Sequence, residues 1–493
     1  MRGDKLPLTM IEREVKSSRI LDGVLMVFSS LIVLWLFLPV ILLLYFISNN
    51  KFKNIILLIG SLIFYAWGEP KYILLMLFSI LINFVFGILI DKFRKYDKYV
   101  LFIAILTNLG ILGYFKYFNF FAANINRIFN QNIIGLRNII LPIGISFYTF
   151  QILSYIIDLY RKEINVQKNI FNLALYVSFF PQLIAGPIVK YKEIEDEINH
   201  RSIDLSLFSS GIRRFVYGLG KKVILANNLA LVADSIYVNS ISNLNTPIVW
   251  LAAVTYTLQI YFDFSGYSDM AIGLGRMFGF HFPENFNLPY ISQSITEFWR
   301  RWHISLSTWF KQYLYIPLGG NRKGKIRTYV NLFIVFLATG IWHGASFNFI
   351  FWGIYYGFFL IIERLFLKKL LDKNGFKFLN HMYVMFIVII GWVFFRANGL
   401  REAIELVKIM FNFDFSKTYI LLPTFINKKT ILIIIISILF SGPLQNLFNK
   451  IQNKDKLTKI YINLEYIVII FILLISIFDL TASTYNPFIY FRF

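Results

Sequence analysis

Long apolar runs separated by short polar connections recur along nearly the whole chain. Most runs hold about 20 residues, the length that an α-helix needs to cross the hydrocarbon core of a bilayer. The pattern predicts an all-α polytopic membrane protein with about ten to twelve crossings. The expected spans are 26–47, 54–67, 71–91, 99–121, 139–160, 171–189, 207–237, 248–275, 329–345, 347–367, 381–397, 429–448 and 460–480.

One expected span is interrupted by proline. The stretch FFPQLIAGPIVK at 179–190 holds Pro181 and Pro187, and each proline removes a helical hydrogen bond. Irregular backbone at membrane depth is tolerated where it is packed inside protein. We therefore expect a re-entrant or kinked segment here.

The polar N-terminus differs from the rest of the chain. Residues 1–25 are mixed in charge and are expected to form a leader, with Met26 as an alternative start. No small-residue cleavage site follows the first apolar run, which argues against a cleaved signal peptide. No long soluble segment interrupts residues 26–493, so we expect a single membrane domain there.

Composition and charge are typical of a membrane protein. The chain is 57% hydrophobic and carries a net charge of +22. The positive residues lie in short connections, as in cytoplasmic loops that face anionic lipid, so we expect contact with membrane lipid and not with nucleic acid. The absence of cysteine from the sequence excludes disulfides, thiolate metal ligands and a thioester on the protein itself.

The apolar run 330–359 carries no Asp, Glu, Lys or Arg and a single imidazole, that of His343. An ionisable residue at bilayer depth is costly and marks a functional-site hypothesis. Gly340 and Gly344 flank the histidine and permit close approach of a backbone or a ligand. Thr339, one turn earlier, is placed to fix the tautomer of the ring, and Trp342 is a candidate lining residue.

A second candidate site lies at 295–318. Aromatic and apolar residues recur there at steps of three and four, which predicts an amphipathic helix. One interpretation is an interfacial anchor helix. The other is a site built around His303 and Trp299, in which Arg300 or Arg301 binds a phosphate-bearing cofactor. The positive neighbours would lower the pKa of His303 and keep its ring neutral.

The basic stretch IPLGGNRKG at 316–324 follows directly. It is either a phosphate-binding loop or only a turn, and the turn is the simpler interpretation.

A third segment, 255–276, places two carboxylates in an apolar stretch. Asp269 shares a helical face with Arg276, which favours a structural ion pair. Asp263 has no obvious local partner and is the better candidate for orienting a distant histidine. Gln259 lies one turn before it. The chain contains no HExxH, GxSxG or GxxxxGK[ST] motif, which argues against zinc, serine-hydrolase and P-loop chemistry.

Three stretches together resemble a known family. They are YFDFSGYSDMAIGLGRMFGF at 261–280, FWRRWHISLSTWFKQYLYIPLGGNRKG at 298–324 and TGIWHGASFNFIFWG at 339–353. They resemble the MBOAT (membrane-bound O-acyltransferase) family, most closely its alginate O-acetyltransferase branch. The apolar run from Met26 and the ending FIYFRF at 488–493 also resemble that branch.

The resemblance implies a fold, an activity and partners. The expected fold is a ring of transmembrane and re-entrant helices around a central tunnel, with His343 as catalytic residue and His303 as the second motif histidine. The expected reaction passes an acetyl group from cytoplasmic acetyl-CoA, with no permanently bound cofactor, across the membrane. An extracytoplasmic SGNH-type protein is expected to place it on a polysaccharide hydroxyl.

Two other functions remain open. The first is D-alanyl transfer to teichoic acid, by a close relative that shares the histidines; the FIYFRF ending favours the acetyl branch. The second, from a different class, is a transporter or flippase without acyl chemistry. That class commonly shows internal repeats, and we find none in the sequence.

Overall fold

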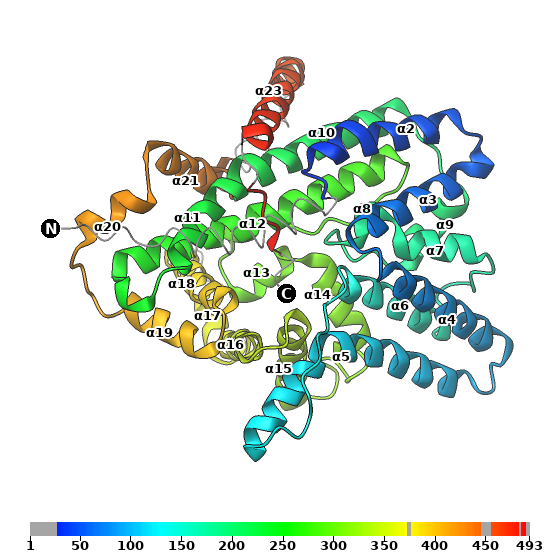
Figure 1. Cartoon of the computed structure of the whole chain (residues 1–493), viewed down its shortest axis with the longest axis horizontal. Coiled ribbons are helices and arrows are strands. Elements are labelled where there is room, and N and C mark those ends of the chain that lie inside the picture. Colours follow the sequence, from blue (N-terminus) through cyan, green and yellow to red (C-terminus); the bar gives the residue numbers. More distant parts are fainter. Residues whose placement is uncertain (1–26, 372–375, 445–454, 483–484, 490–493) are drawn as a thin grey trace. The chain divides into compact units, whose positions relative to one another are not determined.

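The computed structural model describes residues 27–371, 376–444, 455–482 and 485–489, and within these ranges the regular elements are all helices. The predicted leader, 1–25, lies outside the described residues. The helices are shown in Figure 1. In chain order they are η1 (Val33–Phe37), α2 (Leu38–Ile47), α3 (Asn50–Gly68), α4 (Ile73–Lys92), α5 (Asp97–Phe129), α6 (Ile145–Tyr160), α7 (Ile170–Ser178), α8 (Phe180–Leu183), α9 (Tyr191–Asn199), α10 (Leu205–Gly220), η2 (Lys221–Ala226), α11 (Asn227–Tyr237), η3 (Ile241–Asn243), α12 (Thr246–Met277), η4 (Pro289–Ile291), α13 (Ile295–Arg301), α14 (Ile304–Phe310), η5 (Lys311–Tyr315), α15 (Lys325–His343), α16 (Phe347–Ile362), η6 (Glu363–Leu367), α17 (Lys368–Leu371), α18 (Lys377–Arg396), α19 (Leu400–Met410), α20 (Thr418–Phe425), α21 (Lys428–Phe440) and α23 (Asp455–Ala482).

Eight helices among the described residues are long and apolar enough to cross a bilayer, and a ninth span results if α20 and α21, bent by 78°, count as one. The protein is therefore an all-α polytopic membrane protein, with fewer such helices than the ten to twelve crossings expected. The eight are Asn50–Gly68, Ile73–Lys92, Asp97–Phe129, Leu205–Tyr237, Lys325–His343, Phe347–Leu371, Lys377–Arg396 and Leu464–Ala482.

Three expected spans account for much of the difference. The stretch 139–160 becomes α6, which has only 16 residues. The proline-rich stretch becomes two short helices, α7 and α8, with Pro181 in the first turn of α8; the predicted break there is confirmed. The stretch 248–275 becomes α12, whose polar side chains lower its hydropathy, and it is not among the eight.

The described chain forms two compact units, each discontinuous in sequence. Unit 1 contains residues 27–40, 216–267 and 404–489, and unit 2 contains residues 41–215 and 268–403. Because the chain passes repeatedly from one unit to the other, neither is a separate stretch of sequence. The single membrane domain expected over 26–493 stays a prediction.

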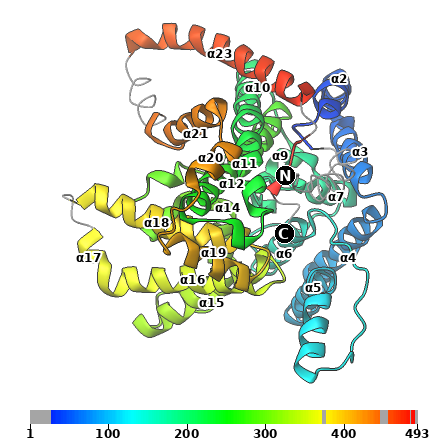
Figure 2. The same ribbon diagram turned by 60° about the vertical axis from the view of Figure 1, so that its left-hand side comes forward.

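Unit 2 is built from helix pairs in close contact. Helix α4 packs on α5 and α6, α3 packs on α7, and α15 packs along α16, which also contacts α18. Figure 2 shows α15 and α16 side by side. Gly340 of α15 and Gly353 of α16 face each other, and a Cβ at Gly353 would lie 3.2 Å from the Cα of Gly340. The predicted close approach at Gly340 is thus made by a neighbouring backbone.

Unit 1 contains a buried ion pair that binds the backbone at residues 487 and 489. Lys222 of η2 lies 2.7 Å from Asp263 of α12, and both side chains are almost fully buried. The backbone N–H of Ile489 donates to the other oxygen of Asp263 at 2.8 Å, and Lys222 donates to the carbonyl of Pro487. Asp263 therefore has a charged partner from another helix, which reasoning from neighbouring residues did not find.

Candidate active site

The predicted amphipathic helix over 295–318 is broken at its histidine. Helix α13 ends at Arg301, and α14 begins at Ile304. His303 lies between them with φ of 45°, in the left-handed region that non-glycine residues rarely adopt. His303 therefore lies in a non-helical connection between α13 and α14.

Glu363 of η6 fixes the start of α13. Its buried carboxylate accepts from the backbone N–H of Ile295 at 2.5 Å and from that of Thr296 at 2.9 Å. A carboxylate at a helix N-terminus satisfies orphan N–H groups and complements the helix dipole. The position of the helix that leads to His303 is thus set by a residue that the sequence analysis missed.

The ring of His303 is buried and hydrogen-bonded to Asn285. Nδ1 of His303 lies 3.1 Å from Oδ1 of Asn285, and the histidine is 1% exposed. Burial lowers the pKa of His303 to about 3. The prediction of a neutral ring is therefore confirmed, but the cause is desolvation and not the positive neighbours that the sequence suggested.

His343 is the last residue of α15, and aromatic rings surround it. The ring centroids of Trp342, Trp352 and Phe395 lie 5.0, 5.1 and 5.0 Å from its own. Its Nδ1 is buried and has no hydrogen-bond partner among the residues that the structure describes. Thr339 donates its hydroxyl to Val335 at 2.8 Å, so the expected contact that would fix the tautomer of His343 is not formed.

Two side chains of α5 hold the end of α15. Lys116 donates to the carbonyl of Trp342 at 2.6 Å, and Tyr117 donates to the carbonyl of Ile341 at 2.6 Å. The last carbonyls of a helix lack intrahelical partners, and a cation there complements the helix dipole. The sequence offered a signal for this contact, because Lys116 is a charged residue inside an apolar span.

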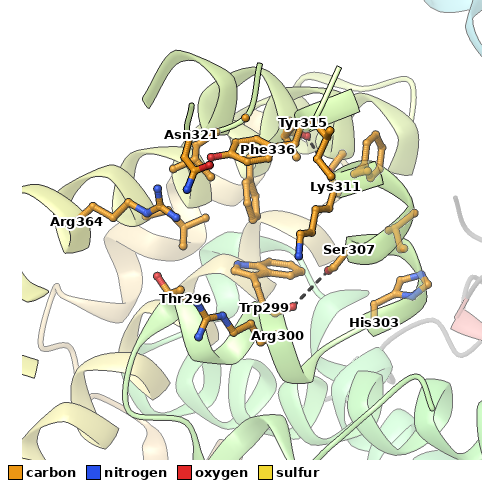
Figure 3. A pocket seen from close by; sticks show the side chains of 18 of the residues that line it. Thr296, Trp299, Arg300, His303, Ser307, Lys311, Tyr315, Asn321, Phe336 and Arg364 are labelled. Atoms are coloured by element: carbon orange, nitrogen blue, oxygen red, sulfur yellow. Dashed lines mark hydrogen bonds between the residues drawn. The ribbon is translucent and has the colours of Figure 1, made fainter. Parts of the chain in front are cut away.

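One cavity of about 690 Å³ in unit 2 is lined by both histidines. Figure 3 shows His303, Arg300, Lys311 and Arg364 arranged around the indole of Trp299. Of the described residues that line the cavity, five are basic and none is a carboxylate. The five, called the basic rim below, are Arg300, Lys311, Arg322, Lys323 and Arg364.

The basic rim matches part of what the sequence suggested. The stretch 319–323, from the basic turn, lines the cavity, which agrees with a binding loop without identifying the ligand. Arg300 faces the cavity, whereas Arg301 binds Glu297 at 2.9 Å and the carbonyl of Asn287 at 3.0 Å. Because guanidinium and ammonium groups bind phosphate strongly, the cavity is suited to a polyanionic ligand.

Other predicted residues lie away from this cavity wall. Trp342 packs on Phe147 and Phe150 of α6, with ring centroids 5.7 and 5.4 Å away. Asp269 of α12 binds Arg214 of α10 at 2.6 Å, whereas the helical spacing had favoured a pair with Arg276.

Gln259 and Asp263 belong to unit 1 and are not among the residues that line the cavity. Among the described residues, no group of three or more His, Asp or Glu side chains is arranged to hold a metal ion.

Comparison with known proteins identifies the family. Residues 160–401 match the model of the membrane-bound O-acyltransferase family. A probable alginate O-acetylase of Pseudomonas putida is 42% identical over 491 residues, which cover 95% of this chain and 100% of that protein. This chain belongs to the membrane-bound O-acyltransferase (MBOAT) family. It is an O-acyltransferase and a multi-pass bacterial membrane protein of the alginate O-acetyltransferase branch.

Two relatives of lower identity differ from each other in the group that their names specify. The peptidoglycan O-acetyltransferase of Helicobacter pylori is 36% identical over 79% of this chain and 81% of its own length. The teichoic acid D-alanyltransferase of Bacillus subtilis is 28% identical over 47% of this chain and 61% of its own length. The similarity is thus higher and more extensive to the acetyl-transferring relatives.

Proposed function

We propose that this MBOAT enzyme takes an acetyl group from cytoplasmic acetyl-CoA and passes it onward for O-acetylation of an exported or cell-surface polysaccharide. The observation that carries the proposal is the cavity that both motif histidines and the basic rim line together. The names of the relatives that cover most of the chain support an acetyl group and a polysaccharide acceptor.

The donor would bind with its phosphates at the basic rim. Coenzyme A carries a diphosphate and a further phosphate at one end and the acyl thioester at the other. Arg300 and Arg364 can bind phosphate oxygens in a bidentate manner, and Lys311 adds a third cation. The thioester end would then reach the part of the cavity that His303 and His343 line.

The reaction needs a proton acceptor and a proton donor. A neutral imidazole of His343 would take the proton of the acceptor hydroxyl as its oxygen attacks the thioester carbonyl carbon. The carbon–sulfur bond then breaks, and the proton goes to the departing thiolate. The products are an acetyl ester and the free thiol of coenzyme A, so atoms and charge balance.

The acceptor would be reached from the outer side. A tunnel that connects the cavity to that side is the arrangement that the family resemblance implies. The hydroxyl belongs either to the polysaccharide or to a separate SGNH-type protein that completes the transfer outside the membrane. The enzyme contributes the crossing step in both cases.

The test measures binding of acetyl-CoA to the purified enzyme in lipid nanodiscs. Neutralising a rim residue (Arg300→Gln, Lys311→Gln or Arg364→Gln) should weaken binding about tenfold, since a charge-assisted hydrogen bond contributes about 1.5–3 kcal/mol. Lys377→Gln removes an exposed charge that does not line the cavity and should leave the affinity unchanged. Higher salt should weaken binding to the wild type more than to the variants.

Three results would contradict the proposal. The first is equal affinity of the rim variants and the wild type for acetyl-CoA. The second is acyl-ester formation only with a D-alanyl-charged carrier protein, which would favour the teichoic acid reaction. The third is transport of a lipid or glycan with no acyl ester formed, which would favour a flippase.

A further inference from the structure

Asn285 has an environment that the proposed reaction does not by itself explain. It lies in the loop between α12 and η4, and its side chain is fully buried. Its side-chain amide is hydrogen-bonded to residues of both α12 and α14. Oδ1 accepts from the backbone N–H of Ser305 at 3.3 Å and from the Ser305 hydroxyl at 2.9 Å. Nδ2 donates to the hydroxyl of Ser268 at 3.0 Å.

The backbone of α14 fixes the orientation of this amide. A backbone N–H only donates, so the amide atom facing Ser305 must be the oxygen. The Ser305 hydroxyl accepts from the backbone N–H of Ile188 at 3.0 Å, which leaves its hydrogen for Oδ1. Rotating the amide by half a turn would set two N–H groups against each other.

The orientation of the amide determines the tautomer of His303. Since Oδ1 of Asn285 can only accept, Nδ1 of His303 must carry the hydrogen that joins them. A neutral imidazole has one N–H, so the lone pair is on Nε2. We propose that Asn285 is a positioning residue that holds His303 in the Nδ1–H tautomer and so makes Nε2 the proton-accepting nitrogen of the ring.

The tautomer assignment does not depend on the proposed function, but its expected effect on the rate of acetyl transfer does. His303 lines the cavity of the proposed donor, where Nε2 would accept a hydrogen bond or a proton from the reacting groups. Among the described residues, the charged and titratable groups that line the same cavity are His343 from α15, Tyr315 from η5 and the five residues of the basic rim. Asn285 itself is neutral, so it fixes the tautomer and orientation of the ring without placing a charge beside it.

The first measurement is independent of activity. The chain contains five histidines, so ¹⁵N-histidine labelling and solid-state NMR of the enzyme in lipid can separate their ring signals. Comparison with His303→Asn assigns the signals of His303. We expect a protonated Nδ1 and an unprotonated Nε2 near neutral pH. The reverse tautomer, or a mixture of both, would overturn the proposal.

The second measurement is the pH profile of acetyl transfer. Asn285→Asp keeps the accepting oxygen but adds a negative charge next to Nδ1, which raises the pKa of His303. An acid limb should then appear at a higher pH than in the wild type, with a tenfold loss of rate per pH unit below it. Asn285→Leu removes the acceptor and should lower the rate at every pH.

The control is Asn287→Asp, which adds the same charge to an exposed position of the same loop. Its profile should match that of the wild type. An unchanged profile for Asn285→Asp would contradict the proposal. If acetyl-CoA is not the donor, the wild type will show no acetyl transfer in the kinetic assay, but NMR will still report the tautomer of His303. Failure of the proposed function can therefore be distinguished from failure of the proposed role of Asn285.

Discussion

At the scale of single residues, the two motif histidines are held in different ways. His303 is fixed by a hydrogen bond to Asn285, whereas His343 is surrounded by aromatic rings, and its Nδ1 has no partner among the described residues. An imidazole without a fixed hydrogen bond can exchange its proton during turnover. This difference favours His343 as the group that takes the acceptor proton.

Replacing His343 tests that role. We expect His343→Gln to lower the rate of acetyl transfer about 10²- to 10⁴-fold, the usual contribution of a general base. Affinity for acetyl-CoA should change little, because the basic rim remains. His281→Gln is the matched control, since His281 is exposed and binds Glu197 away from the cavity. Wild-type rates for His343→Gln would exclude the catalytic role.

Burial of His303 makes the stability of the enzyme depend on pH. The pKa of this residue is lowered to about 3, below its ordinary value of 6.5. Below pH 6.5 the unfolded chain binds a proton that the native state does not bind, so stability falls as the pH drops, by up to about 1.4 kcal/mol per pH unit. Above pH 6.5 this contribution is constant.

Thermal unfolding between pH 4 and 8 measures the effect. The melting temperature of the wild type should fall further on acidification than that of His303→Gln. Above pH 6.5 the plots of melting temperature against pH should be parallel for the two proteins. Parallel curves over the whole range would show that His303 is protonated in the native state.

Sequence reasoning located those site residues whose chemistry stands out locally. His343 and Lys116 are ionisable residues in apolar spans, although only the histidine was recognised. His303, Trp299 and Arg300 lie in one motif. Asn285 and Arg364 were missed because each reaches the site from outside the helices that carry the motif histidines, and such contacts leave no periodic signal in the sequence.

At the scale of elements, the apolar pattern predicted most helices but not the breaks that shape the site. The spacing of aromatic residues over 295–318 continues through His303, so periodicity indicates one helix. The structure breaks it because Asn285 binds His303 and Ser305 from outside the helix. The proline-rich break after α7 was predictable, since proline interrupts a helix by itself.

The close contact between α15 and α16 at Gly340 and Gly353 leaves no room for a side chain. A Cβ at Gly353 would collide with the carbonyl oxygen of Phe336, so we expect Gly353→Ala to destabilise the enzyme by about 1–3 kcal/mol. Gly357, one turn along the same helix, has its nearest neighbour at 3.5 Å, and Gly357→Ala should be neutral or slightly stabilising.

Melting temperatures of the two variants in nanodiscs make this comparison. Because α15 ends at His343, Gly353→Ala should also reduce acetyl transfer in the fraction that folds. Equal stability of the two variants would contradict the close approach.

At the scale of the whole molecule, a buried ion pair in unit 1 joins segments that are far apart in the sequence. Lys222 and Asp263 neutralise each other, and together they bind residues 487 and 489. Removing one partner leaves an uncompensated buried charge, so Lys222→Met or Asp263→Leu alone should cost about 3–5 kcal/mol. The double variant should recover much of that loss.

A double-mutant cycle of unfolding free energies checks this coupling. Additive effects of the two single variants would show that the charges act independently. The sequence alone left Asp263 open as a histidine-orienting residue, because its partner comes from a different helix and no local spacing reveals it.

The central claim is that the cavity lined by both histidines and the basic rim holds the acyl donor. A cryo-EM structure of the enzyme in nanodiscs with saturating coenzyme A tests it most directly. The account predicts density in this cavity, with the phosphates against Arg300, Lys311 and Arg364 and the thiol end between His303 and His343. Coenzyme A bound elsewhere, or lipid filling the cavity at saturating coenzyme A, would contradict it.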